Sequence, residues 1–408
     1  MHRRIAALVL VCFCAGSVNL QAQDFKLFDR KVQVHGFASQ GFVYTDTNNW
    51  LTMRSNEGSP AFTDFGVNAS TGINDKLRIG AQLYDRKLGE LGSYHVSLDW
   101  ALADYRFKSW LGLRGGKVKT TLGLYNDTQD LDFLRIFALL PQSIYPTDVR
   151  DDTIAHLGGD IYGNVQLKKG LGDLSYTAYI GRRKDSASGG HAYTVSSYNA
   201  YFSSGLQFGA DLRWNTPLKG LLVGVSRINE ELVGKGKFMD PFNPGTMVPS
   251  REVSKADWNN QFYGQYIVGK LGIDAEYSRF VHDGIVNRGA FETVTDVRGW
   301  YVAATYRIFK RLAVGSYYSR YSTTSQSWGP LDAVVPDEGD SSLPGNHIYD
   351  KVISARVDLK KFWNVKLEGH FMNGYGINTY PNGFYPQENP HGFTDNTNAL
   401  VVKTGINF

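Results

Sequence analysis

The chain contains little cysteine and no long hydrophobic run. Its two cysteines, Cys12 and Cys14, both lie within the first 22 of its 408 residues. The remainder therefore has no disulfide framework, no thiolate metal site and no cysteine nucleophile. No stretch of the roughly 20 apolar residues that a spanning helix needs is present, so the sequence excludes helical membrane spans.

The chain also lacks an excess of charge of one sign, with 43 basic residues against 39 acidic residues. Removing residues 1–22 takes away Arg3 and Arg4 and no acid, so the formal net charge falls from +4 to +2. Such a balance gives no argument for binding to nucleic acid. We find no linker, low-complexity tract or heptad run, and one pattern extends over the whole chain.

The first residues have the layout of a secretory signal. A basic start at Arg3 and Arg4 precedes an apolar run from Ile5 to Ala15, and small and polar residues follow. This order is typical of a signal peptide, and the run is too short to span a membrane. We expect residues 1–22 to be a signal peptide, with cleavage after Ala22, and residues 23–408 to form the mature protein.

Apolar and polar side chains alternate in short segments along residues 23–408. In the segment 206–214, for example, Leu206, Phe208 and Leu212 alternate with Gln207 and Asp211. Successive side chains of a strand point to opposite faces, so this alternation predicts strands. We predict 16 strands, with approximate starts at residues 31, 62, 77, 94, 110, 153, 173, 205, 220, 256, 271, 294, 311, 347, 363 and 397.

The connections between these strands alternate between short turns and long polar loops, with both ends of the chain on the short-turn side. This asymmetry is typical of a transmembrane β-barrel, and an even number of strands closes the sheet without an edge. A soluble sandwich or propeller also alternates. Aromatic residues at strand ends, such as Trp214, Tyr277 and Trp363, favour a membrane. We therefore predict an all-β, transmembrane antiparallel barrel of about 16 strands, with short periplasmic turns and long extracellular loops.

The final strand places Leu400, Val402, Ile406 and Phe408 on one face. This ending resembles the C-terminal signature of bacterial outer-membrane proteins. The resemblance implies that Phe408 is an assembly signal, read by the barrel assembly machinery.

A second resemblance is more local. The stretch "GKVKTTLGLYN", Gly116–Asn126, resembles the "GKxKxPxGL" strand of the phosphate-selective porin O/P group, with Thr121 in place of the usual proline. Porins of 16 strands enclose an aqueous channel. The porin resemblance implies a homotrimer in the outer membrane of a Gram-negative cell. Outer-membrane lipid and lipopolysaccharide would be its partners, and small polar solutes would be its cargo.

The segment 125–153 would be loop 3, which in porins folds into the barrel and narrows the lumen. Its apolar residues 133, 136, 137 and 140 suggest a short helix, for which Asp130 could be the cap. A loop this long without sheet structure is usually functional or disordered, and its apolar residues argue against disorder. We expect its charged residues to contribute to a pore constriction: Asp127, Asp130, Asp132, Arg135, Asp148, Arg150, Asp151 and Asp152.

The opposite pore wall would carry basic residues that point into the lumen: Arg78, Arg114, Lys117, Lys119, Arg213, Arg356 and Lys366. Acidic loop charges that face a basic wall would create a transverse field, and rings of charge select ions. Each of these residues could instead be a solvated charge or a salt-bridged support. The segment 110–124 also shows a change of alternation near Gly115–Gly116, which suggests a bulge.

These observations predict an outer-membrane porin for the passive diffusion of small hydrophilic solutes and ions. The alternative is a substrate-selective channel for phosphate or organic anions. An outer-membrane hydrolase is a further alternative, but no histidine lies beside a recognisable nucleophile motif. We expect no enzymatic activity, no metal site, no cofactor and no nucleic-acid partner.

Overall fold

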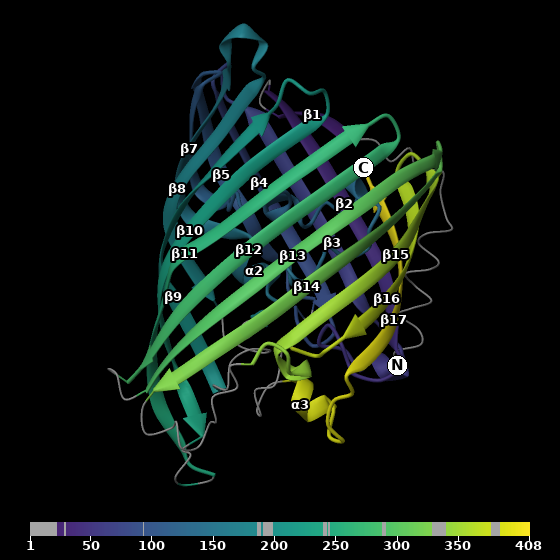
Figure 1. The fold of residues 1–408 in the computed structure, drawn as a ribbon. Coiled ribbons are helices and arrows are strands. Elements are labelled where there is room, and N and C mark those ends of the chain that lie inside the picture. Colours follow the sequence, from purple (N-terminus) through teal and green to yellow (C-terminus); the bar gives the residue numbers. More distant parts are fainter. Residues whose placement is uncertain are drawn as a thin grey trace.

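The structure is a computed structural model that describes residues 23–27, 30–92, 94–185, 189–190, 199–239, 243, 245–287, 291–328, 340–376 and 384–408. These residues form a barrel of tilted strands (Figure 1). The expected signal peptide, residues 1–22, lies outside the described residues. The described part of the chain has no helix that is both long and apolar enough to cross a membrane.

Sixteen strands, β2 to β17, make up the barrel wall within the described residues. Their bounds are β2 Arg30–Thr45, β3 Ser59–Gly72, β4 Leu77–Leu88, β5 Ser97–Lys108, β6 Leu111–Lys119, β7 Ala155–Gln166, β8 Asp173–Asp185, β9 Asn199–Asn215, β10 Leu221–Met239, β11 Met247–Val268, β12 Leu271–Val286, β13 Phe291–Phe309, β14 Leu312–Trp328, β15 His347–Lys360, β16 Trp363–Asn373 and β17 Asn396–Asn407. A short additional strand, β1 (Gln23–Leu27), pairs with β2.

The described helices are short. The α-helices are α2 (Arg150–Thr153) and α3 (Phe384–Glu388), and the 3-10 turns are η1 (Ser55–Glu57), η2 (Asn126–Thr128), η3 (Asp132–Leu134), η4 (Lys168–Gly170) and η6 (Pro344–Asn346). They all lie in connections between strands, so the chain is close to all-β, as predicted.

The barrel closes where the first and last wall strands meet. Strand β17 pairs antiparallel with β2, from Ala399 opposite Thr45 to Asn407 opposite Phe37. Beyond this ladder, Gly36 and Phe408 exchange two backbone hydrogen bonds, each 2.8 Å long. The Phe408 ring lies against Gly36 and leaves no room there for a side chain. The predicted closed antiparallel barrel is confirmed.

The two faces of each strand differ in the way that the alternation predicted. On β9, the outward side chains of Leu206 and Phe208 are each 47% exposed, whereas Gln207 and Asp211, which point inward, are 2% and 5% exposed. An apolar outer surface with polar residues inside is the arrangement of a transmembrane barrel. Burial of Gln207 and Asp211 also shows that the lumen is occupied at this level.

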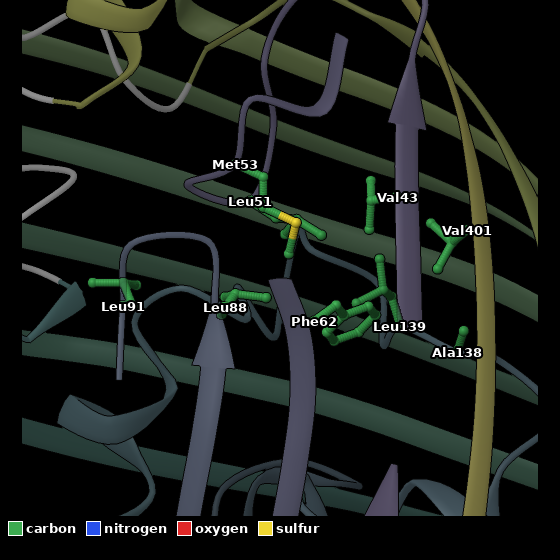
Figure 2. Close-up of a cluster of buried hydrophobic side chains, with 9 residues drawn as sticks. All are labelled: Val43, Leu51, Met53, Phe62, Leu88, Leu91, Ala138, Leu139 and Val401. Atoms are coloured by element: carbon green, nitrogen blue, oxygen red, sulfur yellow. The ribbon is translucent and has the colours of Figure 1, made fainter. Parts of the chain in front are cut away.

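Two loops fill part of the lumen. Loop 1, between β2 and β3, contributes Leu51 and Met53 to an apolar cluster, and loop 3, between β6 and β7, contributes Leu139 (Figure 2). The wall residues Val43 and Val401 complete one side and are fully buried. The barrel interior is therefore dry on this side, which the sequence did not predict.

Most strands begin close to the predicted positions, and all but β9 and β11 start within three residues of them. Strand β11 begins at Met247 rather than near residue 256, because its first part continues the ladder with β10. The predicted bulge at Gly115–Gly116 is wrong. In the β5–β6 ladder, Arg106 is opposite Gly112, and the register continues unbroken along β6 as far as Lys117, so no residue is inserted at Gly115–Gly116.

Candidate functional site

Loop 3 lies inside the barrel and contacts the wall on several sides. The Leu124 amide donates to Glu276 of β12 over 3.0 Å, and the Ser143 hydroxyl donates to the carbonyl of Trp300 on β13 over 3.2 Å. On another side, the Ala138 amide donates to Glu368 of β16 over 2.9 Å. Loop 3 is thus fixed to the wall at separate points across the lumen.

Asp132 lies between two buried lysines of the wall. Lys403 Nζ is 3.2 Å from the Asp132 carboxylate and Lys366 Nζ is 3.5 Å from it, and Lys403 also contacts Asp64 at 2.7 Å. Burial alone would raise the pKa of Asp132, but the ammonium groups of Lys366 and Lys403 outweigh burial and hold this pKa well below its usual range. The predicted constriction residue and the predicted wall residue therefore form one ion-paired anchor.

Lys366 also binds the loop backbone. Its ammonium group donates to the carbonyls of Asp132 over 2.6 Å and of Phe137 over 3.0 Å, and its side chain is 1% exposed. A cation so enclosed is a support for loop 3 rather than a group that meets a passing solute.

Two arginines donate hydrogen bonds to backbone carbonyls in the same part of loop 3. Arg356 of β15 donates to the carbonyls of Phe133 and Arg135, and to the Asp358 carboxylate over 2.7 Å. Arg135 itself donates to the carbonyls of Thr128 and Gln129, each over 2.7 Å. Both guanidinium groups stabilise the fold of the loop.

The helix expected between residues 131 and 140 is not formed. Only the 3-10 turn η3 is present, and Asp130 does not cap it. Asp130 instead accepts from Lys119 over 2.7 Å and from Gln82 over 2.6 Å. Burial acts to raise the pKa of Asp130, but the nearby cations of Lys119 and Arg150 lower it overall.

The apolar residues that suggested this helix pack against the wall in a different way. Phe137, Leu140 and Tyr145 form a buried cluster with Tyr301 and Tyr317 of β13 and β14. The rings of Phe137 and Tyr317 meet edge to face with centroids 5.0 Å apart. Contact with the wall has therefore replaced the helix that the local pattern favoured.

The end of loop 3 is held by a buried ion pair. Arg150 binds the Asp99 carboxylate of β5 through two hydrogen bonds of 2.9 Å and 3.1 Å, and the two side chains are 5% and 3% exposed. Asp151 accepts from Arg86 of β4 over 2.9 Å. Arg86 and Asp99 were missed by the sequence analysis, although the alternation around Arg86 placed it on the inward face.

Two further acids of loop 3 are also enclosed. Asp148 is 6% exposed and Asp152 is 4% exposed. Burial raises the pKa of Asp148, and the positive charge of Arg86 only partly opposes this shift. The Tyr385 hydroxyl of α3 donates to Asp148 over 3.3 Å, so the loop between β16 and β17 also contacts loop 3.

A buried carboxylate of β12 gathers several donors at the opposite wall. Glu276 accepts from the hydroxyls of Tyr145 and Tyr301 and from the Gln261 amide, at 2.6 to 2.8 Å. Together with the Leu124 amide, these donors satisfy a group that would otherwise be unstable in a buried site.

One predicted set of charges faces open space. Arg78, Arg114 and Lys119 of the wall and Asp127 of loop 3 line a single pocket on the inner side of β4, β5 and β6, together with Ser70, Ile79, Gly80, Trp100, Leu102, Asp104 and Thr121. Arg114 is 27% exposed and its guanidinium binds Asp160 over 2.8 Å. Burial raises the pKa of Asp127, while Arg213 and Lys119 oppose this shift.

The two predicted pore-wall residues not yet described, Arg213 and Lys117, lie on different faces of the wall. Arg213 points inward, where it donates to the carbonyl of Gly123 in loop 3 over 3.0 Å. The register shows which face Lys117 takes. Lys117 of β6 is opposite Ala101 of β5, and Ala101 is opposite Ala81 of β4. Both alanines lie on the outward face of their strands, together with exposed residues. The predicted lumen position of Lys117 is wrong, because without a bulge the alternation turns its side chain outward.

The described residues contain no group of three or more His, Cys, Asp or Glu side chains that could hold a metal ion. Loop 3 is fixed across the lumen by ion pairs, and the pocket lined by Arg78, Arg114, Lys119 and Asp127 lies beside it. This arrangement can restrict a passage and set the charge that a solute meets.

No family model matches the sequence, and no curated protein matches it. Solved structures with the same fold are nevertheless numerous. Outer-membrane expressed OmpT of Vibrio cholerae is 12% identical, with a TM-score of 0.56, and the match covers 95% of this chain and 100% of that chain. The anion-selective porin from Comamonas acidovorans is 11% identical, with a TM-score of 0.53 and coverage of 93% and 100%.

A third similar structure is OmpF of Salmonella typhi in complex with daunomycin. It is 15% identical, with a TM-score of 0.52, and the match covers 95% of this chain and 100% of that chain. At such identities the likeness concerns the fold, so the chain has the barrel fold of bacterial outer-membrane proteins.

Proposed function

We propose that the protein is a porin of the Gram-negative outer membrane that conducts small hydrophilic solutes and ions by passive diffusion. The observation that carries this proposal is loop 3, fixed inside a barrel whose outer face is apolar. The pocket between Asp127 and the β4–β6 wall would form part of the remaining passage. The similar structures include one named as an anion-selective porin and one named as an outer membrane channel, which supports the proposal.

Planar-bilayer recordings test this function. A diffusion channel gives discrete steps of ohmic conductance that do not saturate with solute concentration. A refolded protein that inserts into bilayers without any steps would contradict the proposal. We further propose that the protein is a homotrimer, which crosslinking before electrophoresis tests; a similar structure of Vibrio cholerae OmpT is described as a trimer form.

A second candidate is a substrate-selective anion channel. The pocket favours this reading because Arg78, Arg114 and Lys119 line it against Asp104 and Asp127. Block of the current by phosphate or by an organic anion, with saturation, would support selectivity over general diffusion. The variant Arg78→Gln should weaken that block, whereas Lys361→Gln in a short turn should leave it unchanged.

We also propose that the protein has no catalytic activity. The test is a lipase and protease assay on the folded protein, with a serine-directed reagent as the probe. Activity that the reagent abolishes would overturn this statement without affecting the channel measurement.

A further inference from the structure

A second pocket lies between loop 3 and the long loops of the barrel. Loop 1, loop 3, strands β14 to β16 and the loop between β16 and β17 all contribute to its lining. Figure 1 shows α3, which is part of that last loop, at the end of the barrel where β16 ends. The pocket has a volume of about 60 Å³, which is room for a few water molecules or one small ligand group. We call it the acid pocket and define it by Trp50, Asp148, Tyr321, Asp350 and Tyr385.

The acid pocket contains two buried acids and no base. Asp148 of loop 3 is 6% exposed and Asp350 of β15 is 3% exposed. Among the described residues that line the pocket there is no lysine, arginine or histidine. A buried carboxylate is destabilising unless it is paired and hydrogen bonded. Each acid therefore needs either a partner behind the lining or a cation inside the pocket.

Asp350 is only half satisfied by its neighbours. The His370 ring of β16 donates from Nδ1 to Oδ2 of Asp350 over 2.8 Å. The other oxygen, Oδ1, is buried and accepts no hydrogen bond from the described residues. Buried side-chain oxygens nearly always have a partner, so this oxygen indicates a missing donor.

Asp148 has weak partners for a buried acid. Its carboxylate accepts from the Val149 amide over 3.1 Å and from the Tyr385 hydroxyl over 3.3 Å. The Arg86 guanidinium acts on it, but its hydrogens go to the Asp151 carboxylate and to backbone carbonyls of loop 3. Burial raises the pKa of Asp148, and the Arg86 charge offsets this effect only in part. A second positive charge beside Asp148 would complete the compensation.

Aromatic rings form much of the remaining lining. Trp50 is partly buried against the apolar cluster of loops 1 and 3, and Tyr321 and Tyr385 line the same pocket. The rings of Tyr375 and Phe393, also in the lining, stack with centroids 4.7 Å apart. The face of an aromatic ring attracts a cation, and the attraction increases when water is excluded. Rings and carboxylates together favour an organic cation over an anion.

The neighbouring loops are acidic as well. The loop 329–346, between β14 and β15, contains four acids, and the loop 374–395, between β16 and β17, contains two. Neither loop contains a lysine or an arginine, so neither has such a base to pair with Asp148 or Asp350. Charges of one sign near a cleft raise the local concentration of ligands of the opposite sign.

We propose that the acid pocket binds the primary ammonium group of a small organic cation. The N–H groups of this ligand donate to Oδ1 of Asp350 and to the Asp148 carboxylate in charge-assisted hydrogen bonds. Its alkyl part lies against the aromatic rings. The inference deepens the proposed function by naming a class of solute, and it rests on that function for the route by which the cation reaches the pocket.

Two other kinds of ligand fit the acid pocket less well. A sugar can donate a hydroxyl hydrogen to Asp350, but it is neutral and leaves the charge of both acids uncompensated. A metal ion at a typical protein site is held by three or more side chains. The described residues contain no such group of His, Cys, Asp and Glu. A primary ammonium group supplies both the charge and the hydrogen-bond donors.

Isothermal titration calorimetry on the full barrel in detergent tests the inference, with n-butylammonium chloride as the probe. We expect Asp350→Asn and Asp148→Asn each to weaken binding at least tenfold. Trp50→Leu should weaken it several-fold, because this change removes a ring face. Butanol has the alkyl chain without the charge, and tetramethylammonium has the charge without N–H donors. Each should bind the wild type at least tenfold more weakly than n-butylammonium does.

Matched variants separate binding from folding. Glu57→Gln removes an exposed acid of loop 1 outside the pocket lining, and it should retain wild-type binding. Asp350→Asn also alters the contact with His370, whereas Asp148→Asn leaves that contact in place and so guards against a folding artefact.

Unchanged n-butylammonium binding in both aspartate variants, or equal binding of butanol or tetramethylammonium, would overturn the inference. Displacement of n-butylammonium by methyl glucoside would overturn it as well and assign the pocket to a neutral sugar. Bilayer conductance reports separately on the proposed function. Ohmic steps without n-butylammonium binding would contradict this inference alone, and binding without any steps would contradict the proposed function alone.

Discussion

Lys366 on β16 donates its ammonium hydrogen to the backbone carbonyl of Asp132 in loop 3 over 2.6 Å. The lysine belongs to the wall and the aspartate to the loop, so this contact fixes the loop to the barrel from within. It also shows why charges predicted to face a pore do not all meet water, because several of them are used to hold the loop.

Replacement of Lys366 with methionine should release this part of loop 3. The change keeps an unbranched side chain but leaves the Asp132 and Phe137 carbonyls without their donor. Breaking a buried ion pair by removing one partner costs about 3–5 kcal/mol, so we expect a loss of that order in the free energy of unfolding. Urea titration monitored by tryptophan fluorescence gives the value. Lys361→Met in the turn after β15 is the control, and an equal loss there would contradict the anchor.

The ionisation of Asp132 should make stability depend on pH. Its pKa in the folded barrel is lower than the value of about 3.9 in an unfolded chain, so the ionised carboxylate stabilises the fold above about pH 4. As pH falls below that value, the unfolded chain binds the proton first and the stabilisation is lost progressively. Asp132→Asn should reduce the slope of unfolding free energy against pH in this range. A slope identical to that of the wild type would show that Asp132 is not responsible.

Two leucines of loop 3 offer a matched comparison. Leu139 is 3% exposed and packs in the apolar cluster of Figure 2, whereas Leu134 is 61% exposed. A buried leucine replaced by alanine costs about 2–5 kcal/mol, so Leu139→Ala should lower the free energy of unfolding by that amount. Leu134→Ala should change it little. Equal effects in urea titration would mean that the cluster contributes nothing special.

The ion pair between Arg150 and Asp99 should matter far more than an exposed pair. Arg150→Gln removes one partner of a pair that is buried on both sides, and we expect a loss of about 3–5 kcal/mol together with faster proteolysis of loop 3. The control is Arg54→Gln, which removes a 68% exposed arginine from its pair with Glu388. Surface pairs contribute little, so limited proteolysis should not distinguish that variant from the wild type.

The selectivity of the channel should change with pH through Asp127. Because burial raises its pKa, Asp127 becomes neutral at a pH above the usual value of about 3.9 for aspartate. Loss of this negative charge beside Arg78 and Arg114 should increase anion preference as pH falls toward that range. Reversal potentials in a salt gradient measure the effect. Asp127→Asn should show high anion preference at neutral pH and little further change, and an unaltered titration would exclude Asp127 as its origin.

The barrel wall could be predicted from the sequence because its pattern is local and repeated. Alternation in segments such as Leu206–Trp214 defines both the strand and its outward face, and the turn after it defines the rim. Lys117 shows the limit of this reasoning. The neighbouring Gly115 and Gly116 do not indicate which face the Lys117 side chain takes. Only the register of β6 with β5 shows that it faces outward.

The interior could not be predicted in the same way, because it depends on contacts between distant segments. The apolar residues of loop 3 have helical spacing, yet Phe137 packs edge to face on Tyr317 of β14 instead. Leu51 and Met53 lie in a polar loop without any periodic pattern, so nothing nearby indicates that they enter the barrel. The ion-pair partner of each charged residue could not be predicted from the sequence either. The pair of Asp130 with Lys119 is an example.

The apolar cluster of Figure 2 has a consequence for the order of folding. Val43 lies on the first wall strand, β2, and Val401 on the last, β17, and Leu51 and Leu139 belong to the same cluster from two loops. Contacts between such distant segments are made late, because the entropy of closing the intervening chain must first be overcome. The cluster is therefore complete only once the first and last wall strands have paired. A barrel whose first and last strands have not yet paired would leave these apolar side chains exposed. This exposed apolar surface would distinguish it from the complete barrel.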